Sequence, residues 1–151
     1  ATKIQVTQDD IRAIQLAKGA LTAGWRLLMD IAGLQTVSRT VLSGAFGAHI
    51  DPLYAMILGM VPDGPLETII AAGNAAGTGA RLALVNGAAR REIEDVVRKV
   101  EKIETATEAK FQDHFVDAMA FPNKAAPYTH LRTLVDLPAP VAASKKRRRR
   151  R

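Results

Sequence analysis

The sequence of 151 residues contains no cysteine. This absence excludes a disulfide, a thiolate nucleophile and a cysteine-ligated iron–sulfur cluster within the chain. Aromatic residues make up only 5% of the sequence, and no apolar run approaches the length of a membrane-spanning helix. The first six residues also lack the apolar core of a signal peptide. With 48% hydrophobic residues, the sequence predicts a single cytoplasmic domain with its own core and no membrane partner.

Positive charge is concentrated at one end of the chain. The net charge is +6, but residues 145–151 are all lysine or arginine, and without these seven charges it becomes −1. The body of the chain is therefore nearly neutral and gives no sign of a basic groove for nucleic acid. Proline and alanine precede the basic block, so residues 123–151 are predicted to be a disordered tail. Such a tail could hold nucleic acid, anionic lipid or an acidic partner through salt-sensitive contacts, and without interleaved aromatic residues a solubility or weak docking role is favoured over specific nucleic-acid binding.

Two glycine-rich stretches each follow a short apolar run. They are residues 41–47 (VLSGAFG) and 69–80 (IIAAGNAAGTGA), and each indicates a buried parallel strand that breaks into a glycine turn before a helix. Glycine allows positive φ and close approach of a ligand, and a helix N-terminus can face an anion. The spacing matches neither the Walker pattern nor a complete dinucleotide fingerprint. From the residues alone, a nucleotide site and a tight packing turn both stay open.

The remaining patterns predict an α/β arrangement. The expected elements are a helix over residues 7–33 with Thr7 and Asp10 as a capping box, a strand at 39–43, a helix opened by Asp51 and Pro52, a strand at 68–72, helices at 74–86 and 88–101, an edge strand at 102–107, and a helix around 111–119. Two strands joined by a helix form a βαβ unit, which predicts parallel pairing.

Several separated motifs resemble those of one family. They are residues 10–20 (DIRAIQLAKGA), 43–47 (SGAFG) with 50–52 (IDP), 73–81 (GNAAGTGAR), and 111–119 (FQDHFVDAM) with 121–122 (FP). In this order they are similar to the C-terminal part of the reductive activators of corrinoid proteins. The resemblance covers nearly everything from about residue 7 to about residue 122.

This resemblance implies a fold and a parent protein. The chain looks like one lobe of an actin-like (RNase H-like) ATPase of the acetate kinase, sugar kinase, Hsp70 and actin type, with mostly parallel strands and packed helices. Residues 1–122 would be that lobe, as a fragment of a larger protein, and residues 123–151 the tail. The parent would also carry an N-terminal [2Fe-2S] ferredoxin-like domain, a linker, a middle domain and the remaining ATPase segments.

The resemblance also implies an activity. The family uses ATP with Mg²⁺ to drive the one-electron reduction of a Co(II) corrinoid protein to Co(I), which returns a methyltransferase system to activity. The fragment alone is expected to be inactive, because the superfamily places its metal-binding and water-positioning acids largely N-terminal to this segment. The expected partners are the corrinoid protein and the other segments of the parent. A homodimer is compatible with the sequence, and nucleic acid is not an expected partner.

Nucleotide contacts are implied at two turns and on the first helix. The SGAFG turn corresponds to the adenosine motif of the superfamily, with alanine at a position where a second glycine is more usual. The second turn and two polar residues of the first helix complete the expected cofactor-binding set, which is Gln15, Lys18, Gly44, Ala45, Phe46, Gly47, Gly73 and Asn74. No catalytic or metal-binding residue is expected in this chain.

Two other functions stay open. In one, the glycines serve packing only, and the chain is an adaptor that binds partners through its basic tail. In the other, the chain is a lobe of a small-molecule kinase of the same superfamily, which predicts phosphoryl transfer to an acceptor by the full-length protein.

Overall fold

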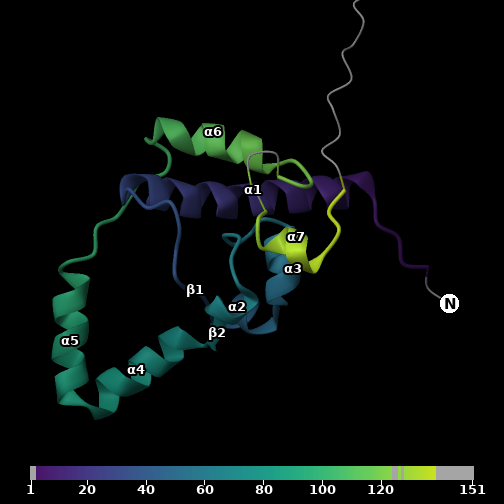
Figure 1. Cartoon of the computed structure of the whole chain (residues 1–151). Helices are drawn as coiled ribbons and strands as arrows, with labels where there is room; N and C mark the ends of the chain where they lie inside the picture. The colour runs from purple at the N-terminus through teal and green to yellow at the C-terminus, as the bar shows by residue number, and fades with distance from the viewer. Residues whose placement is uncertain (1–2, 124–125, 127, 139–151) are drawn as a thin grey trace, which may run out of the picture.

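The computed structural model describes residues 3–123, 126 and 128–138, without the side chain of Phe46. A long helix lies beside a two-stranded sheet and several shorter helices (Figure 1). In chain order the elements are α1 (Gln8–Ile31), β1 (Thr40–Ser43), α2 (Gly44–His49), α3 (Pro52–Ile57), a 3-10 turn η1 (Leu66–Thr68), β2 (Ile69–Gly73), α4 (Ala75–Val85), α5 (Gly87–Val97), α6 (Ala109–Ala118) and α7 (Leu131–Leu134).

Helix α1 begins at the predicted capping box. The Thr7 hydroxyl accepts a hydrogen bond from the Asp10 backbone N–H at 3.2 Å, and the Asp10 carboxylate accepts one from the Thr7 N–H at 2.8 Å. These bonds satisfy donors that the first turn of a helix leaves without partners. The helix ends at Ile31, and Gly33 follows with φ of +67°. The predicted bounds of this helix are confirmed.

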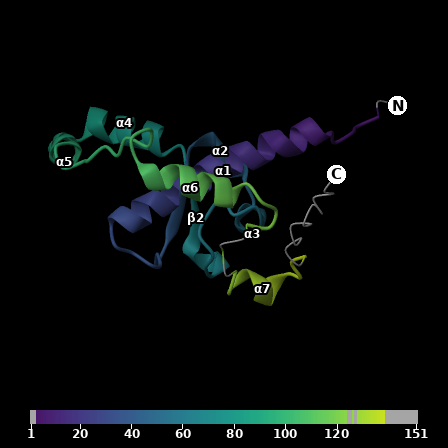
Figure 2. The same ribbon diagram turned by 90° about the horizontal axis from the view of Figure 1, so that it is seen from above.

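Helix α6 packs lengthwise against α1, as Figures 1 and 2 both show. Gly19 allows the close approach, because a Cβ at this position would lie 3.4 Å from both the Met119 and Phe115 side chains. Phe111 and Phe115 stack within α6 with centroids 6.4 Å apart. The predicted helix around residues 111–119 and its apolar contacts are confirmed.

Strands β1 and β2 pair in parallel, as predicted. Thr40 pairs with Ile69 and Val41 with Ile70, so alternate pairs point to opposite faces of the sheet. Ile69 faces the core and is only 7% exposed, whereas Val41 and Ile70 are 51% and 42% exposed. The prediction that both strands are fully buried is therefore wrong for one face, because no element in the described residues covers it.

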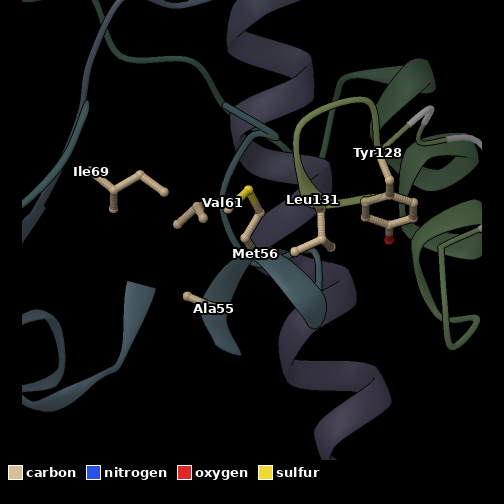
Figure 3. Close-up of a cluster of buried hydrophobic side chains, with 6 residues drawn as sticks. All are labelled: Ala55, Met56, Val61, Ile69, Tyr128 and Leu131. Atoms are coloured by element: carbon tan, nitrogen blue, oxygen red, sulfur yellow. The ribbon is translucent and has the colours of Figure 1, made fainter. Parts of the chain in front are cut away.

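The core lies between α3, β2 and the segment that carries α7 (Figure 3). Its buried members are Ala55, Met56, Val61, Ile69, Tyr128 and Leu131. Helix α3 begins as predicted, with Asp51 as N-cap and Pro52 in its first turn.

The ordered fold extends past residue 122, where the tail was predicted to begin. Tyr128 is 2% exposed and Leu131 is fully buried. The Asp63 carboxylate accepts hydrogen bonds from the His130 and Leu131 N–H groups, each at 2.9 Å, and so holds the start of α7. The tail prediction failed for residues 128–138 because Tyr128 and Leu131 are buried in the core and hold this proline- and alanine-rich stretch against the fold. Residues 139–151, with the basic block, lie outside the described residues.

Helices α4 and α5 meet at a corner away from α1 (Figure 1). The Asn86 backbone ends α4, and its side chain accepts a hydrogen bond from Ala88 N–H at 2.9 Å to cap α5. The predicted edge strand at 102–107 is wrong. Thr107 instead turns back on Glu104, with its N–H donating to the Glu104 carbonyl at 3.1 Å. Alternation of residue types cannot create a strand where no neighbouring strand offers a partner. No helix in the described residues has the length and apolar character needed to cross a membrane.

Candidate functional site

The two glycine turns meet at one edge of the sheet. Ser43, the last residue of β1, pairs with Gly73, the last residue of β2, through a register shift. Gly44 follows Ser43 directly and Asn74 follows Gly73. Both turns therefore leave the carboxyl ends of adjacent parallel strands, which is where open α/β sheets bind ligands.

Gly44 and Gly73 have the conformation that the sequence predicted. Their φ angles are +87° and +58°, and a Cβ built on either would meet no atom within 4 Å. The backbone therefore favours glycine at both positions, and the space that a side chain would occupy is open. Open space beside a left-handed glycine is compatible with the close approach of a ligand to the backbone.

Gly47 and Gly77 differ from this pair. A Cβ on Gly47 would lie 2.7 Å from the Leu42 carbonyl carbon, and one on Gly77 would lie 2.6 Å from the Asn74 Nδ2 atom. Packing against the Leu42 backbone therefore requires glycine at position 47, whereas a Cβ at position 77 would press on the Asn74 amide group. The SGAFG stretch is also less of a loop than predicted, since α2 begins at Gly44 itself.

Asn74 holds the start of α4 in place. Its Oδ1 atom accepts a hydrogen bond from the Gly77 N–H at 2.8 Å, which is the usual N-cap contact. The helix start therefore adjoins the edge formed by Gly44 and Gly73, and its dipole favours negative charge there. Ala45 is exposed on α2, and the Phe46 side chain lies outside the described part of the chain.

Lys18 and Gln15 do not lie on the face of α1 that approaches the glycine turns. The Lys18 Nζ atom donates a hydrogen bond to the Ala120 carbonyl and lies 4.5 Å from the centroid of the Phe121 ring. Gln15 is half-buried three residues earlier, which places it on the same side of the helix. The structure thus gives Lys18 a partner inside the fold, and the contact of both residues with a nucleoside stays a prediction.

An apolar cavity lies between α1 and the first turn. Its volume is about 200 Å³. Leu21 of α1 and Leu42 of β1 contribute to its walls, with Gly47, Ile50 and Met60 from the segment that follows. The face of α1 that approaches the first glycine turn therefore carries apolar residues rather than Gln15 and Lys18.

Sequence reasoning missed two polar contacts, one between α1 and the segment after α3 and one between Asn123 and Tyr128. The Thr22 hydroxyl is placed to donate to the carbonyl oxygens of Lys18 and Gly59. The Tyr128 hydroxyl accepts a hydrogen bond from the Asn123 N–H at 2.9 Å. No sequence motif marks these residues, although a threonine within an apolar helix is a weak sign of such a bond.

The groups at the sheet edge formed by Gly44 and Gly73 are suited to binding a ligand. Backbone N–H groups and a helix start can receive an anion, and the described residues contain no group of three or more acidic or histidine side chains arranged to hold a metal. The Asp51 carboxylate, the acid nearest in sequence to the first turn, accepts a hydrogen bond from the Leu53 N–H at 2.8 Å as the cap of α3.

Comparison with known proteins gives consistent matches. Residues 1–132 match the family model described as the C-terminal domain of RACo, the ASKHA domain. The chain is 36% identical over 115 residues to the corrinoid activation enzyme RamQ of Eubacterium limosum, which covers 75% of this chain and 19% of the relative. A solved structure of a reductive activator for corrinoid, iron–sulfur protein superposes with a TM-score of 0.74 at 30% identity, over 86% of this chain and 20% of that one.

The chain spans about a fifth of the length of these relatives. Its mixed helix and strand fold with a parallel pair matches an ASKHA-like lobe of the solved reductive activator. The match to the family model ends at residue 132, within α7, and so extends beyond residue 122. The chain belongs to the family of the C-terminal ASKHA domain of RACo.

Proposed function

We propose that the chain is the nucleotide-binding lobe of a reductive activator of corrinoid proteins and that ATP contacts it at the Gly44 and Gly73 turns. The observation that supports this most directly is the pairing of Ser43 with Gly73. It brings two left-handed, unobstructed glycines to the same edge of a parallel sheet. Family membership and the relatives' names support the link to corrinoid activation.

The residues at the edge fit the adenosine side of a nucleotide. Gly44 and Gly73 leave room against the backbone, and Asn74 fixes the start of α4 beside them. Gly47 lets α2 lie against β1, so that the first turn keeps its shape. In this proposal the backbone N–H groups of the turns bind and orient the nucleotide, while Gln15 and Lys18 are not required contacts.

The complete activator would provide the reaction. ATP with Mg²⁺ would supply the free energy for an unfavourable one-electron transfer from the [2Fe-2S] cluster of the parent to the Co(II) corrinoid protein, which becomes Co(I). The cluster must lie outside this chain, because the chain has no cysteine. Closure of two ATPase lobes around the nucleotide is a physical route by which ATP turnover could change contact with the corrinoid partner.

Titration with ATP and Mg²⁺, followed by amide hydrogen exchange, tests the proposal in this chain and in the longest available parent. Nucleotide should protect residues 44–47 and 73–79 together and leave α5 unchanged. Gly44→Val should abolish this protection, because a β-branched side chain would fill the open space and resist positive φ. Gly79→Ala is the control, because a Cβ at this α4 position meets no atom within 4 Å, and it should leave the protection of residues 44–47 unchanged.

The possible outcomes separate the functions. Failure of nucleotide to protect either turn in both proteins would refute ATP binding at this edge. If removal of residues 139–151 abolishes the only measurable binding, the chain acts as an adaptor. Phosphoryl transfer from ATP to a small acceptor by the parent would identify a kinase lobe instead.

A further inference from the structure

Lys18 is a basic side chain that is buried without an acidic partner. It lies in the middle of α1 and is 1% exposed. Its Nζ atom contacts the Ala120 carbonyl and the face of the Phe121 ring. None of the ion pairs in the described part of the chain includes it. A buried ammonium with one neutral acceptor and one ring loses more hydration than these contacts return.

The segment that covers Lys18 is thin. Residues 119–123 follow α6 and form neither helix nor strand. Ala120 and Phe121 lie over the amine, yet Phe121 is itself 38% exposed. The far end of the segment is attached by the hydrogen bond from Asn123 N–H to the Tyr128 hydroxyl. Met119 and Asn123 anchor the two ends of this segment, and an irregular segment whose middle faces solvent can open locally while the rest of the fold stays intact.

The ionisable groups around Lys18 do not compensate its charge. Arg26, two turns further along α1, repels the ammonium. Residues 119–123 carry no ionisable side chain. On α6, His114 is paired with Asp30, and Asp113 and Asp117 are exposed. Tyr128 contributes a phenol whose pKa is raised by burial.

Burial, and after it the repulsion by Arg26, lowers the pKa of Lys18 to about 8. When the segment opens, the amine meets water, where an ordinary lysine has a pKa of about 10.4. The open form therefore binds the proton more tightly than the closed form. By linkage, protonation favours opening, and loss of the proton favours closure, between these two pKa values.

We propose that residues 119–123 form a strap over Lys18 that opens more readily when the amine is protonated and closes when the proton leaves to solvent. The strap lies apart from the two glycine turns, since Lys18 faces Ala120 whereas Leu21 is the α1 residue that lines the cavity beside Leu42 and Gly47. Near neutral pH the strap stays closed even though closure buries the protonated Lys18 amine, which costs free energy. An anion or acidic side chain that reached Lys18 in the open form would find an uncompensated positive charge.

Amide exchange of Phe121 and Asn123 as a function of pH tests the strap in the full chain. After correction for intrinsic exchange, protection at these amides should rise about tenfold between pH 7 and pH 9. Lys18→Met removes the charge and keeps the length of the side chain, so its protection should not change with pH. Lys102→Met is the matched control, because the Lys102 side chain is 83% exposed. A flat profile in the unsubstituted chain, or the same slope in Lys18→Met, would overturn the proposal.

A second measurement does not depend on any variant folding. Acetic anhydride modifies only the neutral amine, and at Lys18 it can act only when the strap is open. The rate at Lys18, followed by mass spectrometry, should level off above about pH 8, whereas the rate at an ordinary exposed lysine keeps rising toward pH 10. If the acetylation rate depends on pH in the same way at Lys18 and at the exposed lysines, protonation of Lys18 does not control opening of the strap.

Discussion

Gly47 lies directly against the backbone of Leu42, where a Cβ would come within 2.7 Å of the Leu42 carbonyl carbon. The neighbouring Gly44 has open space instead and a φ of +87°. Two glycines three residues apart in one motif thus serve different physical needs. Gly47 brings α2 onto β1, and Gly44 turns the chain at the edge where a ligand could approach.

Substitution of Gly47 should therefore destabilise the fold. Gly47→Ala is expected to lower the free energy of unfolding by about 1–3 kcal/mol, because the added methyl group meets backbone that cannot move freely. Urea denaturation followed by circular dichroism measures the loss. Gly79→Ala, inside α4 with no atom within 4 Å of its Cβ, should instead raise stability by about 0.5–1 kcal/mol. Equal effects at the two sites would contradict the packing role of Gly47.

The contact between α1 and α6 depends on Gly19. Gly19→Leu should lower the free energy of unfolding by about 1–3 kcal/mol, since Met119 and Phe115 already lie 3.4 Å from the position of a Cβ. Gly24→Ala on the same helix meets no atom within 4 Å and should be stabilising by about 1 kcal/mol. Thermal unfolding of the two variants side by side makes the comparison, and a tolerated leucine at position 19 would show that α6 is free to shift.

Stability should fall at acid pH partly through Asp30. A hydrogen bond from His114, the largest cause, lowers the pKa of Asp30, and the nearby Lys110 charge acts in the same direction. The folded state therefore binds the proton less tightly than the unfolded state. The stabilisation from this carboxylate is fully present above its unfolded pKa and is lost as the pH falls through the folded value.

Urea midpoints measured from pH 6 down to pH 3 test this expectation. Asp30→Asn should lose less stability over that range than the unsubstituted chain does. His114→Gln should also reduce the acid-dependent loss, because the main cause of the shift is removed. An unchanged acid profile in both variants would mean that the pair does not stabilise the α1–α6 contact.

Asp63 should hold the segment that carries α7. Asp63→Ala leaves the N–H groups of His130 and Leu131 without their acceptor, and the expected cost is about 1–2 kcal/mol. The loss should be seen first as faster amide exchange in residues 130–135. Asp136→Ala is a suitable control, since Asp136 is exposed beyond α7. If amide exchange in residues 130–135 is the same in Asp63→Ala and Asp136→Ala, α7 is held by the burial of Leu131 and not by Asp63.

Local signals in the sequence were sufficient for much of the fold. The capping box of Thr7 and Asp10, the Asp51–Pro52 start and the parallel pairing of the strands follow from short-range rules, and all are confirmed. The glycine turns were found for the same reason. Their division into packing and open positions depends on Leu42 and Asn74 as neighbours in space, which spacing along the chain cannot reveal.

The predictions that failed depended on tertiary contacts. Residues 102–107 alternate as a strand does, but a strand also needs a partner. Residues 128–138 have the composition of a tail, yet Tyr128 and Leu131 enter the core. The nucleoside contact that the resemblance implies for Lys18 stays a prediction, and only the fold shows that Ala120 and Phe121 lie over its amine.

Val41 and Ile70 leave one face of a parallel pair uncovered in the described residues. Folded parallel sheets carry protein on both faces, so this face calls for a further layer. Until such a layer is present, Val41 and Ile70 keep apolar surface in contact with water, and this edge pair is open to association with other apolar surfaces.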